Sequence, residues 1–233
     1  MLFTMPNRHA PTENFAQPSS RLTAAMLRHA PILPGEFFNR DPVTVGRELL
    51  GKLLIRREGR RLLAGRIVED EAYLGVEDPA AHAYSGRTPR NSVLFGPPGH
   101  AYVYFIYGNH YCLNVSCMPE GYAGCVLLRA MEPGFGLPAM ARARGLELTA
   151  TPRPTQLRLI SSGPGRMSQA LGITRLCDND KDLTSPASDL WFADDGYRPE
   201  HITATPRVGI TKAVEQPLRF VIAGSPFVSA TRA

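Results

Sequence analysis

Two hydrophobic periods alternate along this chain and divide it into helices and strands. A helical period begins at Asp41-Pro42, where a good N-cap residue is followed by proline, and it ends near Gly51. From residue 52 to residue 74 the pattern changes to the period of two that is typical of β-strands, with turn residues at Glu58-Gly59. The pattern therefore predicts a helix followed by two strands joined by a turn.

Three further β-rich runs follow in quick succession. They read HAYVYFIY, HYCLNVSC and CVLLRAMEP, and they are separated by Gly108-Asn109 and by PEGYAG. Such tight connections predict an antiparallel meander. Because helices and strands are mixed without a regular β-α-β alternation, the chain is predicted to be one α+β domain. The remaining expected elements are short helices at 137–145 and 161–173 and strands at 189–193, 207–211 and 218–224.

The first 33 residues differ from the rest of the chain. They are rich in Pro, Ser, Thr, Asn and Gln and show neither period, so we expect a flexible tail at 1–33 and a folded domain at 34–233. No apolar run approaches the ~20 residues that span a bilayer, and the start lacks the apolar stretch of a secretory signal. We therefore expect a soluble protein without a membrane partner.

Composition narrows the classes of partner. The 233 residues are 43% hydrophobic and 20% charged, as in ordinary globular proteins, and the net charge of +5 favours a polyanion, with nucleic acid first and an anionic membrane surface second. The cysteines form no CxxC pair, and no HxH or HExxH motif is present. No metal and no cofactor are expected. The four cysteines are Cys112, Cys117, Cys125 and Cys177.

Three consecutive acids, Glu69, Asp70 and Glu71, are candidates for chemistry. On a strand, Glu69 and Glu71 share a face with Tyr73, while Asp70 points to the other face. A carboxylate beside an aromatic ring could activate water, although a solvated strand end explains the run as well. Periodicity does not choose between Glu69 and Glu71. Arg129 lies in the apolar run CVLLRAME and needs a partner, which a carboxylate such as Glu71 could supply.

Aromatic and basic side chains suggest contact with nucleic acid. Alternation places Tyr102 and Tyr104 on one face of a strand and Tyr107 on the other, at the edge of the hairpin. Stacking of an aromatic ring on a base contributes about 1–3 kcal/mol per base to binding. Each tyrosine could instead be packed in the protein core. His82 lies in a loop, where it could serve a binding site or only make an incidental hydrogen bond. Arg87, Arg90 and Arg166 lie in basic loops. These loops could bind phosphates, or they could simply be exposed to solvent.

Several long motifs, in order, resemble one family. The segments GRIVEDEAYLGVEDPAAH, GRTPRN, GPPGHAYVYFIYGNHYCLNV, VLLRAMEP, SGPGRMSQALGI and PLRFVIAGSPFVS closely resemble the alkyladenine (3-methyladenine) DNA glycosylase family of the mammalian type, over residues 33–228. The resemblance implies a single mixed domain around a curved antiparallel β-sheet surrounded by helices. It also implies a monofunctional base excision repair enzyme that flips out alkylated or deaminated purines of duplex DNA and leaves an abasic site.

The resemblance also implies roles for individual residues. Tyr107 would intercalate at the hairpin tip, Asn114 would exclude guanine by a clash with its exocyclic amine, and Leu127 would pack in the same pocket. The flipped base would be held between the side chains of Tyr73, His82 and Tyr104.

The implied chemistry is hydrolytic. Glu71 would be the general base for water that attacks the sugar C1′, and Arg129 would orient that water. Arg87, Arg90 and Arg166 would contact the DNA backbone. Relatives often carry an apolar residue where Asn109 stands, which would weaken wedging into the minor groove. We expect a cytoplasmic, nucleoid-associated, monomeric bacterial protein.

Two other classes compete with the glycosylase hypothesis. A non-catalytic nucleic-acid-binding module would use the same aromatic and basic features without hydrolysis. A sugar-directed hydrolase would need two acids placed across its substrate. Because the sequence offers one carboxylate beside an arginine and a tyrosine-rich pocket, the glycosylase is favoured.

Overall fold

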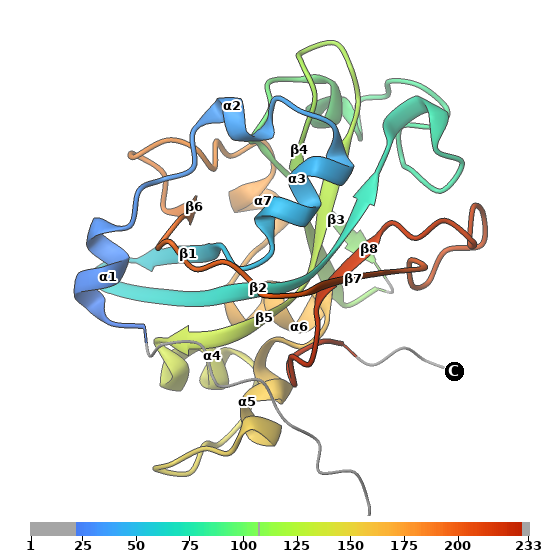
Figure 1. Ribbon diagram of the computed structural model, residues 1–233. Helices are drawn as coiled ribbons and strands as arrows, with labels where there is room; N and C mark the ends of the chain where they lie inside the picture. Colours follow the sequence, from blue (N-terminus) through green and yellow to red (C-terminus); the bar gives the residue numbers. More distant parts are fainter. Residues whose placement is uncertain (1–21, 107, 230–233) are drawn as a thin grey trace, which may run out of the picture.

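An antiparallel β-sheet organises the residues that the computed structural model describes, which are 22–106 and 108–229 (Figure 1). Its strands follow the order β3-β4-β5-β2-β1-β6, and β8 pairs with both β2 and β7. The predicted α+β domain and its meander are confirmed. The strands are β1 (Leu53–Glu58), β2 (Arg61–Tyr73), β3 (Ala101–Ile106), β4 (His110–Ser116), β5 (Cys125–Phe135), β6 (Leu190–Ala193), β7 (Ile202–Thr205) and β8 (Arg219–Ile222).

Strand β2 is the central element because it is paired along both edges. One edge pairs with β5 along most of its length, while the other pairs first with β1, over residues 61–66, and then with β8, over residues 69–71. Figure 1 shows β2 curving across the whole molecule. The acidic run Glu69–Glu71 therefore lies inside the sheet, flanked by strands on both sides, and not at a solvated strand end.

Short helices surround the sheet. Helix α3 begins as predicted, since the Asp41 carboxylate accepts a hydrogen bond from the Thr44 backbone N–H at 2.9 Å, and Gly51 follows its end at a φ of +88°. No helix of the described ranges is long and apolar enough to cross a bilayer. The helices are α1 (Ala24–His29), α2 (Gly35–Phe38), α3 (Pro42–Leu49), α4 (Leu137–Ala143), α5 (Pro154–Ser161), α6 (Pro164–Ala170) and α7 (Arg175–Asp178), with 3-10 turns η1 (Gly75–Glu77) and η2 (Ser92–Phe95).

The two faces of the sheet are covered by different helices. Helix α3 packs on β2 so closely that a Cβ on Gly46 would lie 3.1 Å from Asp70 Oδ1. Helices α5 and α6 pack instead on β4 and β5, and in Figure 1 they lie below the sheet together with α4. Because side chains alternate along a strand, Asp70 meets α3, whereas Glu69 and Glu71 are directed elsewhere.

The structure differs from two sequence-based expectations. Residues 24–29, inside the predicted tail of 1–33, form α1, and Leu27 and Leu33 are buried. Residues 1–21 lie outside the described residues. The predicted strand at 207–211 is wrong: this segment is a loop, and β7 precedes it. The alternation of this segment does not reflect strand pairing, because Arg207 is instead buried against the Asp78 carboxylate, which lies 129 residues earlier in the chain.

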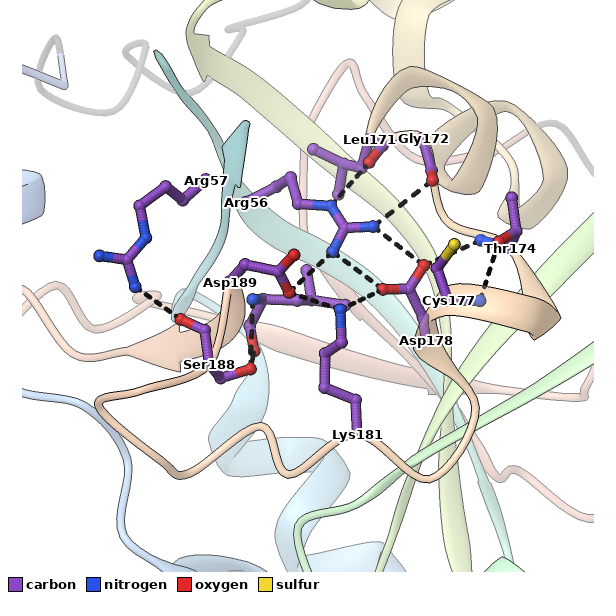
Figure 2. Close-up of polar contacts among 11 residues, drawn as sticks. Arg56, Arg57, Leu171, Gly172, Thr174, Cys177, Asp178, Lys181, Ser188 and Asp189 are labelled. Carbon is purple, nitrogen blue, oxygen red and sulfur yellow. Dashed lines mark hydrogen bonds and ion pairs between the residues drawn. The ribbon is translucent and has the colours of Figure 1, made fainter. Parts of the chain in front are cut away.

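A buried ion-pair network fixes helix α7 to the sheet (Figure 2). The fully buried Asp178 carboxylate accepts hydrogen bonds from both terminal nitrogens of Arg56, at 2.8 and 2.9 Å, and from Lys181 Nζ at 2.7 Å. The next residue, Asn179, accepts a hydrogen bond from the Val103 N–H at 3.0 Å. The network thus holds this segment against β3, the strand that carries two tyrosines of the site described below.

Candidate active site

All three acids of the β2 run are fully buried. The register between β2 and β5 shifts on either side of Glu69, which pairs with Ala130, whereas Asp70 pairs with Leu128. Arg129 therefore has no opposite residue on β2, and such bulges redirect side chains. The Arg129 side chain reaches both Glu69 and Glu71, which confirms the expectation that it needs a carboxylate partner. The alternative of a solvated acidic run is wrong.

The Glu71 carboxylate is held by three donors from different parts of the chain. Oε1 accepts the Val208 backbone N–H at 2.7 Å and lies 3.0 Å from Arg129 Nη1, while Oε2 accepts the Tyr73 hydroxyl at 2.9 Å. Burial raises the pKa of Glu71 above its ordinary value, although Arg129 and the two hydrogen bonds oppose the shift. Since an oxygen of a carboxylate has two lone pairs, Oε2 retains one further acceptor position.

Glu69, two residues earlier, has a different environment. Its Oε1 lies 2.8 Å from Arg129 Nε and 2.7 Å from Arg219 Nε, and it also accepts the Ser229 hydroxyl at 2.7 Å. Oε2 accepts the Ser229 backbone N–H at 2.5 Å. Burial alone would raise the pKa of Glu69, but Arg129, the Ser229 N–H and Arg219 together hold it below its ordinary value. Glu69 is therefore a structural anion that orients Arg129.

Asp70 contributes nothing to this face. Neither carboxylate oxygen has a hydrogen-bond partner, and the side chain is fully buried beneath α3. Burial, followed by the charges of Glu69 and Glu71, raises the pKa of Asp70 well above its ordinary value. A protonated Asp70 avoids a third negative charge at this point of β2.

A cleft of about 1150 Å³ opens over Arg129. Its walls come from the β3–β4 hairpin, the end of β2, the loop at 79–82, the start of α6 and the loop at 208–212. Every base-pocket residue predicted from the sequence lines this cleft, although they come from five separate parts of the chain. Those residues are Tyr73, His82, Tyr104, Asn114 and Leu127.

Aromatic rings form one wall of the cleft. The His82 and Tyr104 rings meet edge to face with their centroids 4.5 Å apart, and His82 Nδ1 lies 2.9 Å from the Tyr102 hydroxyl. Partial enclosure and the charge of Arg90 lower the pKa of His82, which favours its neutral form. His82 is exposed and Tyr104 half-buried. The rings therefore offer accessible aromatic surface to a flat ligand.

Polar groups at the back of the cleft are fixed by the sheet. Asn114 is buried on β4, and its Nδ2 donates a hydrogen bond to the Tyr102 carbonyl oxygen at 3.1 Å. Leu127 lies opposite Asn114 on β5. The thiol of Cys125 donates to Asn114 Oδ1 at 3.8 Å, and burial raises its pKa to about 12. Cys125 is thus a neutral thiol in contact with the Asn114 amide.

The predicted DNA-contacting residues divide into two groups. Arg166, at the start of α6, lines the cleft, whereas Arg87 and Arg90 lie on the exposed loop before η2 and do not line it. Lys212 also lines the cleft, a residue that the sequence analysis did not select. Tyr107, the predicted intercalating residue, lies outside the described residues, so its role stays a prediction.

Several residues that support the site were not selected from the sequence. Val208 acts through its backbone N–H, which no side-chain pattern reveals. Arg207 lies 4.6 Å from the centroid of the Tyr73 ring and pairs with Asp78, so it supports Tyr73 from behind. Arg219 follows Glu69 by 150 residues. An arginine within an otherwise apolar strand, as at Arg219, was the one signal available.

Geometry and charge together define a protein with a buried carboxylate–guanidinium pair beneath a cleft that is lined by accessible aromatic rings. Comparison with known proteins gives the class of enzyme. The family model described as methylpurine-DNA glycosylase (MPG) matches residues 36–226. The chain belongs to the methylpurine-DNA glycosylase family, and its activity is that of a DNA glycosylase, a hydrolase of N-glycosidic bonds in DNA repair. The family prediction from the sequence is confirmed.

Relatives match over most of their length. A protein of Koribacter versatilis is 62% identical over 200 residues, which are 86% of this chain and 94% of the relative. A protein of Methanoculleus marisnigri is 50% identical over 203 residues (84% and 98%), and one of Burkholderia cenocepacia is 45% identical over 199 residues (85% and 91%). All three are provisionally named 3-methyladenine DNA glycosylases.

Proposed function

We propose that this DNA glycosylase excises 3-methyladenine and related alkylated or deaminated purines, such as 7-methylguanine, hypoxanthine and ethenoadenine, from duplex DNA. The names of the relatives support 3-methyladenine as a substrate. The single observation that carries the proposal is the Glu71–Arg129 pair beneath a cleft lined by the rings of Tyr73, His82 and Tyr104.

The purine reaches the cleft by flipping out of the duplex. Unstacking costs a few kcal/mol, and stacking on His82 and Tyr104 returns part of that cost. Alkylated purines such as 3-methyladenine are cationic, so electron-rich tyrosine rings favour them over normal bases. Asn114 excludes guanine through a clash with its exocyclic amine, and Tyr107 fills the space that the base vacates.

Glu71 acts as the general base. A water molecule donates a hydrogen bond to the free acceptor position of Oε2 and attacks C1′ of the deoxyribose. Its proton passes to Glu71, the bond between C1′ and the purine breaks, and the bonding electrons leave with the purine. A cationic alkylated purine leaves as a neutral base, whereas hypoxanthine and ethenoadenine take up a proton from solvent as they leave. The raised pKa of Glu71 makes the carboxylate a better base. Arg129 orients the attacking water, and its position is itself fixed by Glu69.

The rest of the DNA is bound electrostatically. Arg166 and Lys212 lie at the cleft, and Arg87 and Arg90 extend the basic surface along the adjacent loop. Such arginines contact phosphates without reading sequence. The protein acts as a monomer on the DNA of a bacterial cytoplasm.

An excision assay tests the proposal. Duplex oligonucleotides with a single 3-methyladenine, hypoxanthine or ethenoadenine are incubated with the protein, and released base and strand integrity are measured separately. The expected products are free purine and an unbroken strand with an abasic site. Binding to every duplex without release of any base would instead support a non-catalytic DNA-binding module.

A further inference from the structure

A second concavity lies at the opposite end of β2 from the active-site cleft. This groove, of about 790 Å³, is formed by α1, the turn between β1 and β2, the start of α4 and the Trp191 region of β6. The active-site cleft meets β2 at Tyr73, whereas the groove meets it at Arg61 and Leu62. At about 3.3 Å per residue, the intervening strand spans up to about 40 Å. One ligand at each site could bind at the same time.

The groove is lined by five arginines and by no acidic residue. Within the described part of the chain, none of these five forms an ion pair. Figure 2 shows Arg57 pointing away from Arg56, the neighbour whose guanidinium is neutralised by Asp178. Clustered like charges repel, so a bound anion would stabilise them. The five are Arg28, Arg57, Arg60, Arg61 and Arg142.

The floor of the groove is apolar. Leu27, Leu62, Phe135 and Trp191 line it and belong to a small hydrophobic cluster separate from the main core. Trp191 is the single tryptophan of the chain and is 9% exposed, with Arg57 lying 5.3 Å from its ring centroid. A ligand that fits both features must combine negative charge with apolar groups.

We infer that this groove binds an acidic, amphipathic peptide segment of another protein. Duplex DNA matches the arginines, but its bases are stacked inside the helix and would leave the apolar floor unused. The N-terminal residues 1–21 of this chain hold one acid, Glu13, against Arg8 and Arg21, so their charge has the wrong sign. An acidic peptide with leucine side chains satisfies the arginines and the floor together.

The probe is a fluorescein-labelled peptide of Glu and Leu that contains no tryptophan. Its binding is followed by anisotropy and, at the groove itself, by the emission of Trp191. Two further peptides, one with Gln for every Glu and one with Ser for every Leu, separate charge from apolar contact. Saturable binding that shifts the Trp191 emission is expected for the first peptide, with about tenfold weaker binding for each of the others.

Two double variants of equal net charge locate the site. Arg60→Gln with Arg61→Gln should weaken peptide binding about tenfold, whereas Arg153→Gln with Arg175→Gln, at exposed positions outside the groove, should change it less than twofold. Binding of an undamaged duplex should be the same for both. Equal losses in both variants, or no shift of Trp191 emission, would overturn the inference. Selective loss of duplex binding in the groove variant would make the groove a DNA surface instead.

Discussion

Replacing Glu71 by Gln removes the proposed base while leaving most of its contacts possible. The amide oxygen can still accept the Val208 N–H, and Arg129 keeps its ion pair with Glu69, so the fold should persist. The negative charge and the ability to accept a proton are lost. Because a general base contributes about 10²–10⁴-fold, the rate of purine release should fall by that factor, or about 3–5 kcal/mol in the activation free energy.

The assay is single-turnover release of hypoxanthine with enzyme in excess, so that product release does not limit the rate. Glu77→Gln is the matched control, since Glu77 is exposed, lies six residues further along the chain and lines no part of the cleft. Its rate should stay within about twofold of the parent, as usual for a surface substitution. If Glu71→Gln released base within about fivefold of the parent rate, the base would have to be another group.

Three further predictions concern pH and stability. The release rate should fall as pH drops through the raised pKa of Glu71, and Glu71→Gln should lose this limb of the pH profile. Asp70 has a raised pKa in the folded protein, so the parent loses stability as pH rises above the pKa that Asp70 has in the unfolded chain. Asp70→Asn does not lose this stability, so its Tm minus that of the parent should become more positive from about pH 3.5 to about pH 7. A constant difference in Tm would contradict this. Asp178→Ala removes the buried carboxylate of Arg56 and Lys181 and leaves them only the half-exposed Asp189, which should cost about 3 kcal/mol and lower Tm by roughly 6–12 °C in calorimetry.

Local patterns were enough to predict most of the fold. The N-cap at Asp41, the turn after Glu58 and the tight turn at Gly108 are each determined within a few residues, so the sequence reveals them. The prediction of a strand at 207–211 failed because the alternation there resembles that of a strand, while Arg207 is buried against Asp78, more than a hundred residues earlier. An ion pair between residues so far apart in the sequence produces no periodic pattern.

In the candidate site, too, the local features could be predicted from the sequence, and the contacts between distant residues could not. Alternation placed Glu69 and Glu71 on one face but could not separate them, because their difference lies in partners distant in sequence. Arg219 and Ser229 surround Glu69, while Glu71 is held by Tyr73 and the Val208 N–H, two residues that line the cleft. The resemblance to the glycosylase family selected Glu71, and its role as the base stays a prediction.

The most direct test is a crystal structure of Glu71→Gln bound to a duplex that contains hypoxanthine. We expect the hypoxanthine outside the helix, between Tyr73, His82 and Tyr104, with C1′ of its sugar facing residue 71 and Arg129. A hypoxanthine that remains stacked in a bound duplex, or that lies outside this cleft, would show that the cleft is not the base-binding site.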